Sequence, residues 1–145
     1  MSFDALFAPM SVSASGLSAE RLRMEVVANN IANAFTTRTP EGGPFRRQDL
    51  VFASVLVDRL KDGQRVQEMG GVEVVELIDD PSELPRVLNP GHPDADAQGY
   101  VLMPNVQVPL ELVNLVTASR AYEANLKVLQ AFRAQAELAF SLLGG

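Results

Sequence analysis

Residues 110–143, LELVNLVTASRAYEANLKVLQAFRAQAELAFSLL, decide the fold. This segment of 34 residues contains no proline and no glycine, and 21 of its residues are apolar. The apolar positions recur at steps of three and four, as at Leu115, Tyr122 and Leu129, and a second apolar row runs beside the first. The pattern predicts one long amphipathic helix whose apolar face is wide enough to contact more than one neighbour.

The length of this helix favours packing between chains. At about 1.5 Å per residue it would extend roughly 50 Å, so a chain of 145 residues would leave much of the apolar face uncovered. The six charged residues of the segment cancel, and Glu123 precedes Lys127 by four positions, the favourable order for an ion pair. A monomeric core is the alternative explanation, but the length and the double row favour contacts with other chains.

A second helix is predicted over residues 10–34. Its apolar positions recur every seven residues, at Met10, Leu17, Met24 and Ile31. The helix should end near Ala34, because Thr39 precedes a proline and is disfavoured in the helical conformation. Pro9 either begins this helix or kinks a helix that begins earlier, and the sequence leaves both possibilities open.

The middle of the chain is rich in turns and short extended runs. Strands are predicted at 50–57 and 72–78, with shorter extended pieces at 86–88 and 100–103, and a short helix at 50–57 is the alternative. The predicted fold is mainly α with a small β-rich insertion, in which two long terminal helices pair as a coiled-coil-like core. We divide the chain into an N-terminal helical assembly segment (1–36), a central acidic loop and strand segment (37–108) and a C-terminal helical assembly segment (109–145).

Composition excludes several function classes. The formal charge is −6, and residues 35–109 carry seven basic and twelve acidic side chains, so nucleic acid is not an expected partner. The absence of cysteine removes disulfides, thiolate metal sites and cysteine nucleophiles. No apolar run approaches the roughly 18 to 20 residues of a membrane span, and the amino terminus has Asp4 where a cleavable signal peptide carries basic residues. We therefore expect no membrane insertion and no cleaved leader.

Candidate chemistry is sparse. His92, Asp94 and Asp96 form an H-x-D-x-D pattern that could gather a metal from an extended chain, but His92 is the only histidine and prolines flank the run. A turn rich in aspartate is the better interpretation. The adjacent carboxylates Asp79 and Asp80 are typical of a solvated turn. No catalytic triad or phosphate loop is found, so we expect neither an enzyme nor a bound cofactor.

Polar side chains near the apolar stripes are more informative. Asn29, Asn30 and Asn33 crowd the end of the first helix, and Asn125 lies midway along the last one. A buried amide must find hydrogen-bond partners, and in helical interfaces such residues fix the register between helices. The arginines Arg38, Arg46 and Arg47 are either contacts for an acidic partner or simply solvated.

Four separated motifs resemble those of bacterial flagellar rod and hook proteins. The first motif, the N-terminal signature, consists of SGLSAER at 15–21 followed by ANNIANA at 28–34. The second, SRAYEANL at 119–126, resembles the C-terminal signature of the same family. The segments TRTPEGGPFRR at 37–47 and NPGHPDADAQGYV at 89–101 are similar to those of its proximal rod members. Phe35 and the end at 142–145 depart from the family pattern.

The resemblance implies a structural subunit of the flagellar basal-body rod, a helical tube that crosses the periplasm and transmits torque. Its implied partners are copies of itself, other rod and basal-body proteins, and the flagellar type III export apparatus. The alternatives are a small metal-dependent enzyme using His92, Asp94 and Asp96, or a cytoplasmic helical adaptor or chaperone. The expected assembly interface comprises Leu17, Met24, Val27, Asn29, Asn30, Ile31, Asn33, Leu112, Leu115, Tyr122, Asn125, Leu126, Leu129, Phe132 and Phe140.

Overall fold

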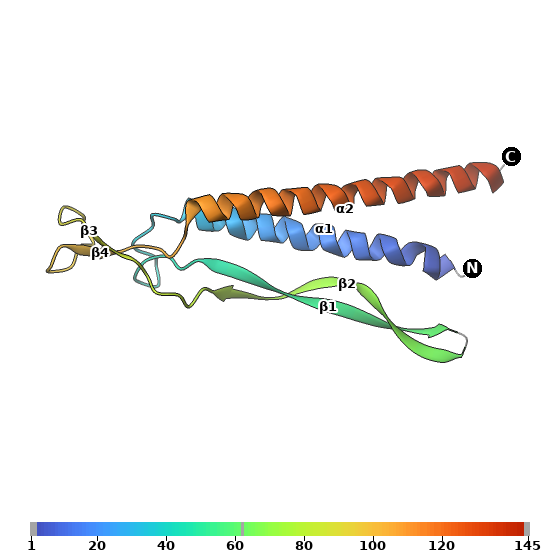
Figure 1. Ribbon diagram of the computed structural model, residues 1–145, viewed down its shortest axis with the longest axis horizontal. Helices are drawn as coiled ribbons and strands as arrows, with labels where there is room; N and C mark the ends of the chain where they lie inside the picture. The colour runs from blue at the N-terminus through green and yellow to red at the C-terminus, as the bar shows by residue number, and fades with distance from the viewer. Residues whose placement is uncertain (1–2, 62, 144–145) are drawn as a thin grey trace. The chain divides into compact units, whose positions relative to one another are not determined.

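The computed structural model describes residues 3–61 and 63–143 (Figure 1). The N-terminal helix α1 spans Phe3–Ala32, and the C-terminal helix α2 spans Val108–Leu143. Between them, in these residues, lie four strands in two antiparallel pairs. The prediction of two terminal helices around a smaller β region is therefore confirmed.

The helix ends follow from local chemistry. Pro9 lies inside α1, which begins at Phe3, so the helix starts before the proline. The helix ends at Ala32, where the N–H of Ala34 donates to the carbonyl of Ile31 at 3.2 Å in a tightened last turn. Pro109 is the second residue of α2, a position where its missing N–H removes no helical hydrogen bond.

Two of the strands are much longer than predicted. Strand β1 spans Gln48–Lys61 and β2 spans Gln64–Asp79, and they pair as a two-stranded sheet. Gly63, between them, has a φ of 79°, the left-handed conformation that a tight hairpin turn requires. The strands predicted at 50–57 and 72–78 are confirmed as strands, but their predicted bounds were too short, because β1 continues to Lys61 and β2 runs through Gly70 and Gly71. The alternative of a short helix at 50–57 was wrong.

The second pair is short, as predicted. Strand β3 spans Arg86–Leu88 and β4 spans Tyr100–Leu102. They run antiparallel, with Val87 opposite Val101. The pairing closes the loop between them, and Val101 is the residue of this pair that becomes buried.

The chain divides into two compact units. Unit 1 contains 1–22, 52–75 and 118–145, and unit 2 contains 23–51 and 76–117. Among the described residues, Ala19 and Ala118 are the buried apolar side chains of unit 1. Those of unit 2 are Val27, Ala34, Leu50 and Val101. Both cores are small and consist mostly of small side chains.

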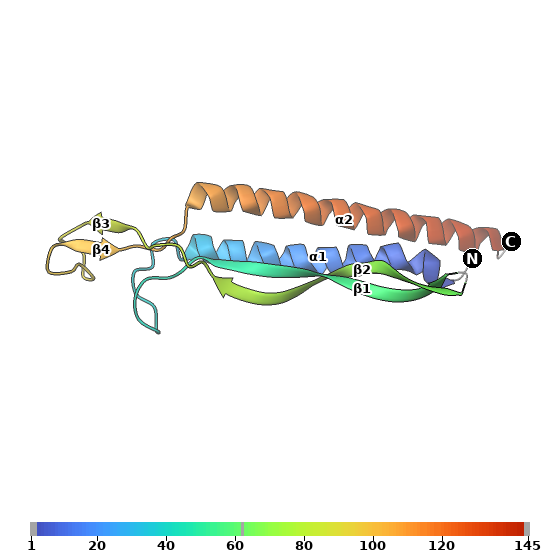
Figure 2. The same ribbon diagram turned by 60° about the horizontal axis from the view of Figure 1, so that its bottom comes forward.

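In unit 1, α1 lies between α2 and the hairpin of β1 and β2. The hydroxyl of Ser15 in α1 accepts a hydrogen bond from the N–H of Val72 in β2 at 3.0 Å. On the other side, a Cβ placed on Gly16 would lie 2.9 Å from Nδ2 of Asn125 in α2. The two views agree on this order within unit 1 (Figures 1 and 2).

Neither of the two described helices is apolar enough over a membrane-spanning length to cross a bilayer.

Candidate assembly interface

A buried polar cluster, which we call the junction, joins three segments of unit 2. Asn30 comes from the last turn of α1, and Glu111 comes from the first turn of α2. Gln48 is the first residue of β1, and Arg47 directly precedes it. The side chains of Asn30 and Glu111 are 0% and 1% exposed. Buried polar groups of this kind cost free energy unless each one is hydrogen-bonded.

Asn30 satisfies the requirement by pairing with backbone. Its Oδ1 accepts a hydrogen bond from the N–H of Gln48 at 2.9 Å, and its Nδ2 donates to the carbonyl of Gln48 at 2.8 Å. The same Nδ2 lies 3.2 Å from Oε2 of Glu111. The side-chain amide of Asn30 therefore makes the two backbone hydrogen bonds that a neighbouring strand would otherwise make with the first residue of β1. Its contact with Glu111 also links α1 to α2.

Arg47 neutralises the buried carboxylate. Its Nε donates to Oε1 of Glu111 at 2.7 Å, and its Nη1 lies 3.0 Å from Asp49 and 3.7 Å from Asp80. Burial opposes the charged form, but the hydrogen bonds from Arg47 to Glu111 and Asp49 outweigh it, and the net effect is a raised pKa of Arg47. The guanidinium is therefore held by carboxylates of its own chain.

The remaining hydrogen bonds of the junction stabilise the turn at 80–82. Asn105 accepts a hydrogen bond from the N–H of Arg47 at 2.7 Å and donates to the hydroxyl of Ser82 at 2.8 Å. Asp80 caps the same turn, and the hydrogen bond from the N–H of Ser82 lowers the pKa of Asp80. The predicted solvated turn at Asp79 and Asp80 is thus a hydrogen-bonded one.

The predicted interface residues have three kinds of surroundings. Val27 and Asn30 are buried within unit 2, so their side chains pack inside their own chain. Asn29, Leu112, Leu126 and Phe140 are exposed. The remaining ones are half-buried: Leu17, Met24, Ile31, Asn33, Leu115, Tyr122, Asn125, Leu129 and Phe132. Their assignment to contacts between chains stays a prediction.

Several exposed apolar residues were not among the predicted ones. On α2 they include Val113, Val116, Leu138 and Leu142. On the hairpin they include Phe52, Leu56, Met69 and Val75, and Met69 is 65% exposed. Phe52, Leu56 and Val75 fall within the predicted strands, but the assembly interface was predicted on the helices alone, so the exposed face of these strands was not considered.

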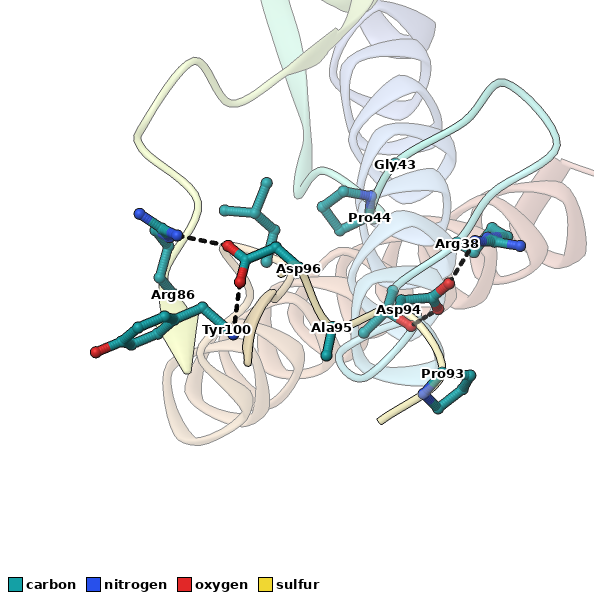
Figure 3. A pocket seen from close by; sticks show the side chains of 11 residues that line it. Arg38, Gly43, Pro44, Arg86, Pro93, Asp94, Ala95, Asp96 and Tyr100 are labelled. Carbon is teal, nitrogen blue, oxygen red and sulfur yellow. Dashed lines mark hydrogen bonds and ion pairs between the residues drawn. The ribbon is translucent and has the colours of Figure 1, made fainter. Parts of the chain in front are cut away.

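Residues 93–96 of the H-x-D-x-D run, but not His92, line a cavity of about 590 Å³ in unit 2 (Figure 3). Asp94 pairs with Arg38 at 2.7 Å and accepts a hydrogen bond from Thr37 at 2.8 Å. Asp96 pairs with Arg86 at 2.7 Å. No three acidic or histidine side chains in the described part of the chain are grouped as metal ligands. The loop brings these carboxylates to arginines, so the alternative of a metal site at this run gains no support.

Asp96 organises the loop between β3 and β4. Its Oδ1 accepts hydrogen bonds from the N–H groups of Gln98 and Tyr100, both at 2.9 Å. Arg86 lies over the ring of Tyr100, 5.0 Å from its centroid. The hydrogen bond from Tyr100 is the largest of the effects that lower the pKa of Asp96, and burial only partly opposes them.

We expect this loop to open in acid. A carboxyl group whose pKa is lower in the folded chain stabilises the fold above its unfolded pKa of about 3.9, and this contribution disappears as the pH falls through the folded pKa. The N–H resonance of Tyr100, followed by NMR from about pH 6 to about pH 2, should therefore shift with a midpoint below that unfolded value. In Asp96→Asn the amide oxygen still accepts hydrogen bonds but does not titrate, so this transition should vanish. A Tyr100 transition that persists in that variant contradicts the assignment.

Known proteins resemble this chain along most of its length. Residues 10–38 match the family described as "Flagella basal body rod protein", and residues 97–137 match "Flagellar basal body rod FlgEFG protein C-terminal". The flagellar basal-body rod protein FlgC of Borreliella burgdorferi is 39% identical over 150 residues, which cover 97% of this chain and 99% of the relative. The FlgC proteins of Yersinia enterocolitica and Bacillus subtilis are 46% and 38% identical, over 81% and 86% of this chain and 83% and 89% of theirs.

Proposed function

This chain belongs to the flagellar basal-body rod protein family, and from this premise we propose that it is a structural subunit of the bacterial flagellar rod. The similarity to rod proteins along nearly the whole chain carries the proposal. The family predicted from the four sequence motifs is thereby confirmed. The basal body is the proposed location, and other basal-body proteins are the proposed partners.

Assembly through the terminal helices is the finer part of the proposal. Ala118 of α2 is completely buried, and Asn125 lies against Gly16 of α1, so close contacts between the helices support a coiled-coil-like pair. Much of α2 nevertheless stays exposed, including Leu126 at 38% and Phe140 at 68%. These surfaces need partners, and we propose that copies of the same chain and other rod proteins supply them.

The energetics suit a stiff assembly. Each large apolar side chain removed from water contributes about 1.5 to 3 kcal/mol, and a subunit that offers several such residues gains many contacts at once. A head-to-tail contact that does not close on itself produces a helical tube. Torque transmission through that tube, and delivery of the subunit by the flagellar type III export apparatus, are further parts of the proposal that rest on family membership.

Neither enzyme chemistry nor an adaptor role gains support. The carboxylates Asp94 and Asp96 already pair with Arg38 and Arg86. The junction likewise uses its charges within unit 2. The geometry therefore favours a scaffold whose polar groups hold its own segments together.

A charge on the exposed side of α2 should block assembly. We expect Leu126→Asp to lower the amount of this chain in purified basal bodies at least tenfold, because burying an unpaired carboxylate costs several kcal/mol, and to abolish motility. Leu129→Asp should do the same, although half-buried Leu129 also contacts its own chain. Quantitative blots of basal bodies from complemented deletion strains measure the effect.

The matched control is Gln107→Asp, which adds the same charge at an exposed polar position directly before the same helix. It should assemble normally. Motile cells with a normal amount of the Leu126→Asp chain in their basal bodies would overturn the interface, and absence of the unaltered chain from basal bodies would overturn the proposed function itself.

A further inference from the structure

The hairpin of unit 1 exposes an apolar face that also carries carboxylates. At 52–56 of β1 and at 68–75 of β2, apart from buried Gly71, half-buried residues alternate with exposed ones, as expected when one side of a sheet is covered. We call six of the exposed residues the hairpin face. It comprises Phe52, Leu56, Asp58, Met69, Glu73 and Val75. Its apolar members are 39% to 65% exposed. The exposed charged side chains described at 52–75 are Asp58, Arg65 and Glu73, so two of the three are acidic and only Arg65, nearer the turn, is basic.

Helix α2 exposes a different face in the same unit. Residues at steps of four, three, four, seven and four lie along one side of a helix. We call this set the α2 outer stripe, and it comprises Arg120, Ala124, Lys127, Ala131, Leu138 and Leu142. All six residues are exposed, and the two leucines are 64% and 82% exposed. Both charged members of the stripe are basic.

These two faces cannot meet within one chain. Helix α1 lies between the hairpin and α2 in unit 1, since Ser15 contacts Val72 on one side and Gly16 approaches Asn125 on the other. Both views show this layering (Figures 1 and 2). The hairpin face therefore needs a partner outside its own chain, and so does the α2 outer stripe.

We propose that the hairpin face of one copy docks on the α2 outer stripe of the next copy. The charges select this pairing: Asp58 and Glu73 meet basic side chains on the stripe, whereas a hairpin–hairpin contact would bring carboxylates together and a stripe–stripe contact would bring Arg120 and Lys127 together. Like charges brought into an interface cost several kcal/mol. No ion pair occupies these four side chains among the residues that the structure describes.

The contact is heterologous, because two different surfaces of the same chain take part. Each copy then offers one free hairpin face and one free α2 outer stripe, so the contact repeats without closing on itself and extends as an open helical array. This inference rests on the proposed function and names the lateral contact by which the subunits would join.

Cysteine cross-linking tests the contact directly, because the chain contains no cysteine. We would introduce Leu56→Cys and Leu138→Cys together and treat purified basal bodies with a bifunctional maleimide. A ladder of cross-linked copies is expected from the double variant, a dimer from cells that express the two single variants together, and no product from either single variant alone. Leu56→Cys with Phe140→Cys is the matched control. Phe140 is as exposed as Leu138 but lies roughly 160° around the helix, so this pair should give no ladder.

A charge exchange provides the second test if the cysteine variants fail to assemble. Lys127→Glu and Asp58→Lys should each lower incorporation into basal bodies by on the order of tenfold. The double variant D58K/K127E should recover most of the loss, since it restores an attractive pairing with exchanged signs.

The possible failures are distinguishable. If the chain is present in basal bodies but the ladder is missing, or a single-cysteine variant gives dimers, or the charge exchange gives no recovery, the docking is wrong and the rod assignment stands. If the unaltered chain is missing from basal bodies, the rod assignment itself is wrong.

Discussion

Glu111→Ala is expected to destabilise unit 2 by about 3 to 5 kcal/mol, the cost of removing one partner from a buried ion pair. The carboxylate is 1% exposed and accepts hydrogen bonds from Arg47 at 2.7 Å and from Asn30 at 3.2 Å. Alanine would leave the guanidinium of Arg47 without its shortest ion pair in a partly buried place. It would also open a cavity beneath the first turn of α2.

Urea unfolding of the purified chain, followed by circular dichroism, measures this loss. Glu83→Ala removes an exposed carboxylate of the same unit and should change stability by less than about 0.5 kcal/mol. The stability of Glu111→Gln should lie between those of the two alanine variants. The glutamine amide keeps one acceptor oxygen, but it turns its NH2 group towards one of the two donors, Arg47 or Asn30. Equal stability of the Glu111→Ala chain and the unaltered chain would show that the junction does not hold unit 2 together.

Gly71→Ala is expected to detach the hairpin from α1. Gly71 has a φ of 140°, which side-chain-bearing residues rarely adopt, and a Cβ there would collide with Oγ of Ser15. Backbone strain of this kind costs about 1 to 3 kcal/mol, and loss of the hydrogen bond from Val72 to Ser15 adds about 1 kcal/mol. The N–H of Val72 should then exchange with solvent at least tenfold faster.

Hydrogen exchange followed by NMR distinguishes the effect of backbone strain at Gly71 from the effect of the steric clash with Ser15. Gly63→Ala is the matched control, because Gly63 also has a positive φ of 79°, but a Cβ added to it would meet no atom within 4 Å. It should destabilise the turn by about 1 kcal/mol and leave the protection of Val72 unchanged. Ser15→Ala should speed exchange at Val72 without backbone strain. Unchanged exchange in Gly71→Ala would mean that the hairpin does not depend on this contact.

The helices could be predicted because their signal is local. Composition and a period near 3.6 residues identified both helices, and the observed α2 begins two residues before the predicted start at 110. The hairpin could not be delimited in this way, because a glycine pair such as Gly70 and Gly71 usually indicates a break between elements. In the structure they lie inside β2, where the strand needs a residue without a side chain to approach Ser15. The dipeptide Asp62-Gly63 was the available signal for a hairpin turn.

The junction could be predicted only in outline. Asn30 was expected to be a buried amide that fixes the register of helices, and the structure does place it beside Glu111 of α2. Its main partner, however, is the backbone of Gln48, which only tertiary folding brings near. Glu111 entered the prediction only as one of the six charges that cancel along 110–143, since nothing local to it reveals its ion pair with Arg47, 64 residues away in the sequence.

The uninterrupted backbone of α2 has a mechanical consequence. Its hydrogen-bond ladder extends over 36 residues with no proline beyond the first turn and no glycine, whereas α1 contains both Pro9 and Gly16. Helices bend most readily at such residues. Under torque the amino-terminal turns of α1 should therefore deform first, while α2 keeps its helical pitch and remains the rigid element of the subunit.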